Sequence, residues 1–202
     1  IGHEITGEIA EIGPGVTGLK RGDAVTTYFY LNCGHCRWCL TSLEPLCENT
    51  GGQVGLECDG AYAEYVKLPA QNFIKLPEGL DYKKHPAEIG VVTDALATPY
   101  KVLRRARVKA GETVAVFGAG GGLGIHQLMM AKWARCRVIA VDTKPRKFDA
   151  GRKAGADEVV DASQGRVVEQ LMDLTAGGGV DVVVDYVSAT ATLEAGAKAL
   201  AR

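Results

Sequence analysis

The spacing of apolar residues divides the chain into a first part with short alternating segments and a second part with longer apolar runs. In the first part, the alternation of apolar and polar positions predicts strands at 5–12, 24–30 and 61–68. Glycine and proline turns separate these segments, as is usual between short strands. This part of the chain is therefore predicted to form a small β-rich domain.

After about Pro86, apolar runs rich in Val, Ile and Ala alternate with segments of helical period. The predicted strands are 113–117, 137–141, 158–160 and 180–184, and the predicted helices are 89–103, 123–134, 147–154 and 166–175. Pro99 is expected to disturb the first of these helices. Because strands buried on both faces read as continuous apolar runs, this order predicts a doubly wound α/β domain with a parallel sheet. The predicted domains are 1–88 and 89–202.

Composition and charge exclude several classes of partner. The 202 residues are 47% hydrophobic and 23% charged, which is typical of folded globular domains. The net charge of -1 and the lack of a long basic run argue against a nucleic-acid partner. No stretch approaches the ~18 apolar residues of a membrane-spanning helix. We therefore expect a cytoplasmic protein that binds neither nucleic acid nor membrane.

Four of the six cysteines lie close together, at Cys33, Cys36, Cys39 and Cys47. Four thiolates on one short loop can surround a Zn²⁺ ion tetrahedrally and leave no coordination position open. A closed site of this kind is structural, because it holds a loop that has little core of its own. An iron–sulfur cluster and a cysteine-rich loop without metal are the alternatives.

A glycine-rich turn links the predicted strand 113–117 to the next helix. Its spacing departs from the strict Gly-x-Gly-x-x-Gly pattern, since Ala119 stands at the first position, before Gly121 and Gly124. Glycines let the backbone approach a pyrophosphate, which the amide groups at the helix N-terminus then bind. Asp142 ends the following strand, where an acid can accept hydrogen bonds from the adenosine ribose. These features predict a dinucleotide site; a turn that binds nothing is the alternative.

Three motifs, in this order and at these separations, resemble the medium-chain zinc alcohol dehydrogenases. Residues 2–7 read Gly-His-Glu-Ile-Thr-Gly and are similar to a zinc-binding element of that family. The cysteine loop resembles its structural zinc lobe, and 118–124 its nucleotide-binding turn. The resemblance covers the whole chain and implies part of a GroES-like catalytic domain followed by part of a Rossmann-type domain. It further implies that His3 binds a catalytic zinc and that Glu4 is a nearby carboxylate able to approach the metal.

The resemblance places a third zinc ligand at Asp94, where many family members have a cysteine. Thr98 and Tyr100 follow at the expected distances, so this chain resembles the subgroup with a carboxylate ligand. Carboxylate oxygen binds zinc acceptably; an exposed acid without a metal is the alternative. Thr98 is expected to touch the nicotinamide ring. Phe29 falls where family members line the substrate pocket, although a core aromatic is nearly as well supported.

The cofactor implied by the resemblance is NAD. Gly121, Gly122 and Gly124 are expected to approach the pyrophosphate, and Asp142 and Lys147 to contact the adenosine ribose. The Asp142 carboxylate would repel the 2′-phosphate of NADP. The neighbouring Arg146 could bind that phosphate, but we expect the carboxylate to decide the preference.

The function implied is reversible oxidation of an alcohol to an aldehyde or ketone, with hydride transfer to NAD. One structural and one catalytic zinc, a small-molecule substrate and a homodimer or homotetramer are expected. A first zinc ligand and a proton relay would precede Ile1, so we expect the chain to be part of a longer polypeptide. A metal-free quinone or enoyl reductase of the same fold and a non-catalytic zinc-bearing module are the alternatives.

Overall fold

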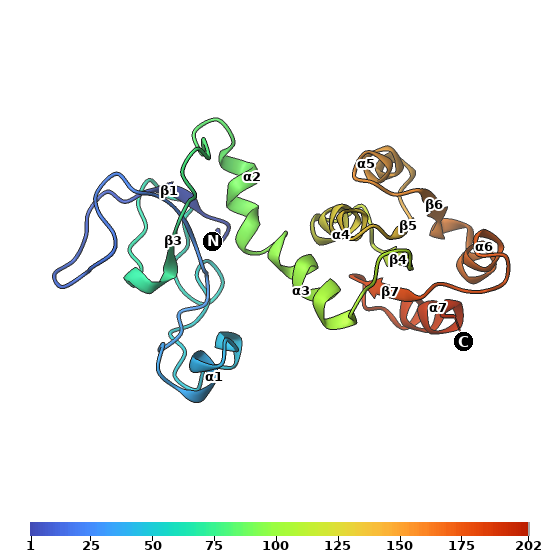
Figure 1. The fold of residues 1–202 in the computed structure, drawn as a ribbon, viewed down its shortest axis with the longest axis horizontal. Helices are drawn as coiled ribbons and strands as arrows, with labels where there is room; N and C mark the ends of the chain where they lie inside the picture. Colours follow the sequence, from blue (N-terminus) through green and yellow to red (C-terminus); the bar gives the residue numbers. More distant parts are fainter. Residues whose placement is uncertain (202) are drawn as a thin grey trace. The chain divides into compact units, whose positions relative to one another are not determined.

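The computed structural model describes residues 1–201, and its contacts divide the chain into two compact units (Figure 1), Ile1–Asp94 and Ala95–Arg202. Each unit has hydrophobic clusters of its own. The division falls a few residues after the boundary at 88/89 suggested by the apolar pattern. The limits of the two family domains stay a prediction.

The first unit contains a three-stranded antiparallel sheet of short strands. Its strands are β1 (Thr6–Glu8), β2 (Ala24–Thr27) and β3 (Phe73–Lys75), in the order β1-β2-β3. The predicted strands 5–12 and 24–30 are thus confirmed only in part. The chain beyond β1 still pairs irregularly, since the Ile9 N–H donates to the Asp23 carbonyl at 3.0 Å.

The predicted strand 61–68 is wrong, and β3 was not predicted. Ala61 and Tyr62 donate backbone hydrogen bonds to the carbonyls of Gly2 and Ile1 at 3.0 and 3.1 Å, and the rest of the segment enters no sheet of the described chain. Tyr62 is 82% exposed, so its apolar ring does not mark a buried face of a strand. The alternation that predicted a strand here has no pairing partner to stabilise it.

Short helices and turns complete the first unit around a core of Ile5, Phe29 and Val54. The helices are α1 (Arg37–Leu40) and α2 (Pro86–Gly90), and the 3-10 turns are η1 (Glu44–Leu46), η2 (Ala70–Asn72) and η3 (Val91–Thr93). Asn72 is buried, and its side-chain amide donates to the carbonyls of Tyr28 and Tyr30 at 2.6 and 2.8 Å. This residue therefore ties η2 to the chain that follows β2.

The single predicted helix 89–103 is wrong, because the backbone leaves helical geometry at Asp94, with φ −130° and ψ −74°. A separate helix, α3 (Ala97–Ala106), begins after it. Pro99 lies in the first turn of α3, where its missing N–H has no intrahelical partner to lose. The interruption therefore comes before the proline and not at it.

The second unit is a parallel four-stranded sheet with helices between the strands. Its strands are β4 (Thr113–Phe117), β5 (Arg137–Asp142), β6 (Glu158–Asp161) and β7 (Val182–Asp185), in the order β6-β5-β4-β7. The helices are α4 (Gly122–Trp133), α5 (Phe148–Lys153), α6 (Val167–Leu174) and α7 (Thr190–Ala199), with turns η4 (Pro145–Lys147) and η5 (Ala162–Gln164). The predicted strands and helices after residue 110 are confirmed to within a few residues; α7 was not predicted.

Both faces of this sheet are buried, as in a doubly wound fold. Along β4, Val114 and Val116 pack in the cluster that contains Leu128 of α4. The alternate residues Ala115 and Phe117 pack in the cluster on the opposite face, with α6 and α7. Because β4 has β5 on one side and β7 on the other, the strand order reverses there. Ligands of such sheets bind beyond the carboxyl ends of the strands at this point.

Candidate functional site

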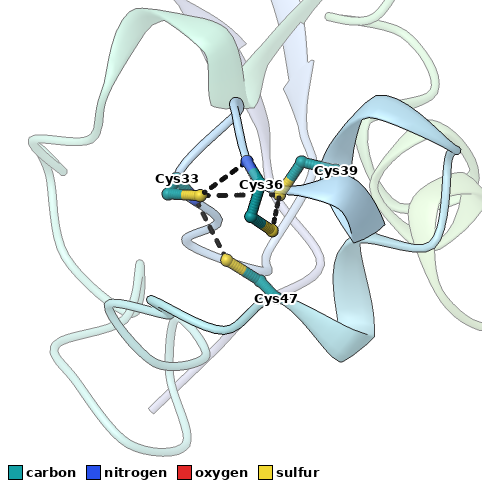
Figure 2. Close-up of side chains that lie close together, drawn as sticks. All are labelled: Cys33, Cys36, Cys39 and Cys47. Atoms are coloured by element: carbon teal, nitrogen blue, oxygen red, sulfur yellow. Dashed lines mark hydrogen bonds between the residues drawn. The ribbon is translucent and has the colours of Figure 1, made fainter.

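The four clustered cysteines converge on one point (Figure 2). Their four Sγ atoms lie within 4.8 Å of one another. Cys33 and Cys39 Sγ are 3.9 Å apart, and Cys36 and Cys39 Sγ are 3.5 Å apart. Tetrahedral zinc with ~2.3 Å Zn–S bonds requires sulfurs about 3.8 Å apart. The cluster therefore fits a zinc ion held by Cys33, Cys36, Cys39 and Cys47.

Backbone N–H groups point at these sulfurs and favour thiolates. The N–H of Cys33 donates to Cys47 Sγ at 3.3 Å, and the N–H of Cys36 donates to Cys33 Sγ at 3.4 Å. N–H groups of Cys39 and Glu48 lower the pKa of the Cys36 thiol to about 6. Burial raises the pKa of the Cys39 thiol to about 12.

The loop that carries the cysteines has little apolar core. Helix α1 is four residues long and buries none of them, and Leu40 is 73% exposed. Exposed polar contacts supplement it, such as Arg37 Nε to Glu48 Oε1 at 3.2 Å. A bound metal would give such a loop the cross-link that packing does not supply. Among residues 1–201, the four cysteines are the one group of three or more potential ligands close enough to hold a metal ion.

His3 and Asp94 meet although 91 positions separate them. His3 Nε2 lies 3.0 Å from Asp94 Oδ2, and both side chains are partly buried. Two ligands of a tetrahedral zinc at ~2.0–2.1 Å lie about 3.4 Å apart. The pair is therefore close to the separation needed by a shared metal ion. The break in the helix before α3 brings the Asp94 carboxylate to this position.

Glycines hold the chain around His3: Gly2 belongs to the predicted zinc-binding element, whereas Gly55 and Gly60 were not singled out by the sequence pattern. Gly2 has φ +94°, in the left-handed region that favours glycine. A Cβ at Gly55 or Gly60 would overlap the backbone of Ile1 and Gly2. Positive φ cannot be read from sequence, and neither can this close approach between segments more than 50 residues apart.

Three further residues were predicted to belong to the catalytic site: Phe29, Glu4 and Thr98. The Phe29 ring is buried in the core cluster of the first unit, and its centroid lies 4.9 Å from that of the His3 ring. Phe29 is thus a core aromatic that also supports the histidine. The Glu4 side chain is exposed beside His3. Thr98 lies in the second unit, on the first turn of α3, and is partly buried.

The glycine turn runs from β4 into α4, as predicted. Gly121 is the N-cap in extended conformation, and Gly122 is the first helical residue. A Cβ at Gly124 would overlap the Gly118 carbonyl oxygen, whereas nothing lies within 4 Å of a Cβ at Gly122. Gly124 therefore allows close packing of the helix against the turn. The open space at Gly122, beside the helix N-terminus, is the kind of cradle that suits an anion.

Asp142 and Lys147 lie beside this turn. Asp142 Oδ2 accepts a hydrogen bond from the Gly120 N–H at 2.8 Å, and Oδ1 accepts one from the Lys144 N–H at 3.0 Å. A Cβ at Gly120 would be 2.7 Å from Lys147 Cβ and 3.0 Å from Asp142 Oδ2. The structure thus brings together the turn, the acid and the lysine that were predicted to hold a dinucleotide. Gly120, which makes this contact possible, was not singled out by the sequence pattern.

The sequence matches two family profiles in the same order as these sites. Residues 1–78 match the alcohol dehydrogenase GroES-like domain, and residues 122–202 match the zinc-binding dehydrogenase domain. Both profiles are domains of alcohol and zinc-binding dehydrogenases, so the predicted resemblance to the zinc-containing alcohol dehydrogenase family is confirmed. The GroES-like and Rossmann-type fold class, expected from the motifs, is confirmed by these matches and by the parallel sheet.

Curated members of the family are similar over nearly the whole chain. An alcohol dehydrogenase of Geobacillus stearothermophilus is 37% identical over 100% of the chain. An NAD-dependent alcohol dehydrogenase of Saccharolobus solfataricus and an L-threonine 3-dehydrogenase of Pyrococcus furiosus are each 34% identical, over 100 and 99% of it. The chain spans 58, 57 and 56% of the length of these relatives, in that order.

Solved structures of the family have the same fold. The alcohol dehydrogenase of the archaeon Aeropyrum pernix has a TM-score of 0.89 and 36% sequence identity, over 99% of this chain and 58% of that one.

Within residues 1–201, no helix is both long and apolar enough to cross a bilayer.

Proposed function

We propose that the chain carries the metal and nucleotide sites of an oxidoreductase that reversibly oxidises an alcohol to an aldehyde or ketone, with NAD as hydride acceptor. The observation that most supports this proposal is the 3.0 Å distance between His3 Nε2 and Asp94 Oδ2. A histidine and a carboxylate at this distance are a ligand pair suited to catalytic zinc.

His3 and Asp94 would hold this zinc, and the cysteine cluster would hold a second, structural one. A bound Zn²⁺ is a Lewis acid that lowers the pKa of an alcohol bound to it. The task of the chain's own residues is to hold its ligands at fixed positions. Phe29 packs against the His3 ring, and Gly2 lets the backbone turn at this point. Glu4 is proposed as a nearby carboxylate that can approach the metal.

The second unit would bind the cofactor. NAD supplies the hydride chemistry, and the protein orients it. Gly121, Gly122 and Gly124 would admit the pyrophosphate at the start of α4, and Asp142 would accept hydrogen bonds from the ribose. The name of the NAD-dependent relative of S. solfataricus agrees with this choice. Lys147 would contact the same ribose, and Thr98 the nicotinamide ring.

The direct test is to measure NADH formation by the complete protein on primary alcohols, secondary alcohols and L-threonine. L-Threonine is included because one relative is named for its oxidation. We expect oxidation of at least one alcohol, loss of the rate on removal of exchangeable zinc, and recovery when zinc is returned. His3→Ala should abolish the rate, while a control at the exposed His85, His85→Ala, should keep it.

Two other results would contradict the proposal. Reduction of a quinone or enone that continues after zinc removal would identify a metal-free reductase. Failure of the complete protein to bind any nicotinamide nucleotide would favour a non-catalytic zinc-bearing module. A homodimer or homotetramer in the cytoplasm is proposed from the family resemblance, and light scattering on the complete protein tests the assembly.

A further inference from the structure

A partly buried hydrogen bond links α4 to the end of β7. Gln127 is fully buried in α4, and its Oε1 accepts a hydrogen bond from the Tyr186 hydroxyl at 2.8 Å. Its amide Nε2 has no hydrogen-bond partner within the described chain. Burial raises the pKa of Tyr186 to about 12, so the hydroxyl keeps the proton that it donates. The Tyr186 side chain packs against the apolar cluster that contains Leu128 and Ala131 of α4.

Asp185, the residue before Tyr186, also holds the segment that follows Tyr186. Asp185 Oδ1 accepts from the N–H groups of Val187 and Ser188, at 2.8 and 3.1 Å. Its Oδ2 accepts from the Thr192 hydroxyl at 2.6 Å, and Thr192 Oγ1 accepts from the Ala189 N–H at 3.1 Å. Residues 186–189, the post-β7 segment, are thus fixed at both ends by side chains.

The post-β7 segment packs on the glycine turn. A Cβ at Gly118 would lie 3.0 Å from Val187 Cγ2 and 3.7 Å from Tyr186 Cβ. Gly118 follows β4 directly, so this contact lies where the strand order of the sheet reverses. A dinucleotide bound there would have the glycine turn on one side and the post-β7 segment on the other.

We propose that the Gln127–Tyr186 hydrogen bond sets the width of the dinucleotide crevice by holding the post-β7 segment against the helix that begins at the glycine turn. Gln127 lies on α4 five residues after Gly122, so the bond joins the helix proposed to hold the pyrophosphate to the segment that faces it. Both are positioning residues, and the inference rests on the proposed binding of NAD.

Two apolar groups of the same shape would fill the cluster as well as this polar pair does, and replacing both partners of a buried hydrogen bond can be nearly neutral for stability. Stability and NAD affinity should therefore respond differently to the loss of both partners. A pair with only a packing role would change the two quantities together. A pair that sets the crevice would change affinity even when stability is restored.

The test measures the unfolding temperature and the Kd for NAD of the complete protein with Tyr186→Phe, Gln127→Met and both substitutions together. Tyr186→Phe leaves the buried Gln127 Oε1 without a partner, and Gln127→Met leaves the partly buried Tyr186 hydroxyl without one, so both single variants should be less stable. We expect the double variant to regain wild-type stability while its Kd for NAD stays raised about five- to tenfold. Its kcat at saturating NAD should change less than its KM for NAD.

A double variant that recovers both stability and wild-type affinity would overturn the inference, and so would single variants with unchanged affinity. A wild-type protein that does not bind NAD would overturn the proposed function, and this inference with it. Thr192→Val offers a second route if the double variant does not fold, because it removes the hydroxyl that links Asp185 Oδ2 to the Ala189 N–H and so loosens the far end of the post-β7 segment. It should raise the Kd, whereas Thr192→Ser keeps the hydroxyl and the affinity; equal Kd values for the two would refute the crevice role.

Discussion

Asp94 shows how a break in regular structure can create a candidate site at the scale of one residue. The apolar pattern continues through it as if one helix ran from 89 to 103. The backbone instead turns out of helical geometry at this residue. Its Oδ2 then lies 3.0 Å from His3 Nε2. In an uninterrupted helix, the direction of this carboxylate would be set by the helical repeat and not by the position of His3. The break in the helix is therefore part of what forms the candidate site.

Asp94→Asn should remove a charged ligand while keeping its shape. We expect the affinity for exchangeable zinc to fall by at least about tenfold, with a matching loss of turnover, because a neutral amide is a poorer zinc ligand. Metal content after dialysis against a chelator, together with the rate, measures this. The control is the exposed Asp149→Asn. Unchanged zinc content and rate would mean that Asp94 is not a ligand.

Asp142 is predicted to decide the choice between NAD and NADP. Its carboxylate would accept ribose hydrogen bonds and repel a 2′-phosphate. Asp142→Gly should lower the ratio of kcat/KM for NAD to that for NADP by about tenfold or more. Asp142→Asn separates charge from shape, since it can still accept the hydrogen bond from the Gly120 N–H. A wild type that prefers NADP, or a ratio that does not move, would show that Asp142 does not select the cofactor.

At the scale of elements, the cysteine loop and the glycine turn depend on different forces. The loop around α1 has converging sulfurs and few apolar contacts. The turn between β4 and α4 is supported by a sheet that is buried on both faces. Loss of one metal-binding cysteine should therefore unfold the loop. A substitution in the glycine turn should leave the surrounding structure folded, because the packed sheet supports the turn.

Cys39→Ser should release the metal of the cysteine cluster. We expect a loss of at least about 2 kcal/mol of stability, equivalent to about 8–16 °C in Tm if the first unit unfolds as a domain of roughly 60–100 residues. Zinc content and thermal unfolding of the complete protein measure the effect. Cys58→Ser is the matched control, because Cys58 lies outside the cluster. A Cys39→Ser protein with normal zinc content and Tm would rule out the structural site.

Two alanine substitutions in the glycine turn should separate packing from ligand binding. Gly124→Ala places a methyl group against the Gly118 carbonyl, so stability should fall by about 1–3 kcal/mol. Gly122→Ala meets open space and should keep the stability while weakening NAD binding, because its methyl group enters the proposed pyrophosphate cradle. Thermal unfolding and calorimetric titration with NAD give the two values. Normal NAD affinity in Gly122→Ala would mean that the pyrophosphate does not bind at Gly122.

At the scale of the whole molecule, the chain consists of two compact units with separate hydrophobic clusters. The proposed metal ligands lie in Ile1–Asp94, and the glycine turn lies in Ala95–Arg202. A ligand stabilises the structure to which it binds. We therefore expect metal binding to stabilise mainly the first unit and nucleotide binding to stabilise mainly the second.

Hydrogen–deuterium exchange of the complete protein, followed peptide by peptide, should show this division. We expect a zinc chelator to raise exchange chiefly in the first unit, around 33–47. NAD should lower exchange chiefly around 118–124 and 142–147 in the second unit. Equal responses of both units to either treatment would show that they unfold together.

The sequence by itself determined the strands of the second unit, the helices between them and the identity of its motifs, but not the start of α3 or the existence of α7. Strands such as β4 and β5 are continuous apolar runs, and a residue's neighbours in the chain carry that information. The cysteine spacing likewise predicted a cluster, because only short loops separate the four residues. Local spacing was enough wherever the interacting groups are close in the chain.

Only the tertiary structure decided how distant groups meet. It showed that 61–68 forms no strand, because strand formation depends on a partner as well as on alternation. It also brought His3 to Asp94, Gly55 to Gly2 and Gln127 to Tyr186. These contacts depend on how packed elements are placed in space, which the pattern of one segment does not contain. The family resemblance named His3 and Asp94 as partners, but their 3.0 Å approach follows from the folded backbone between them.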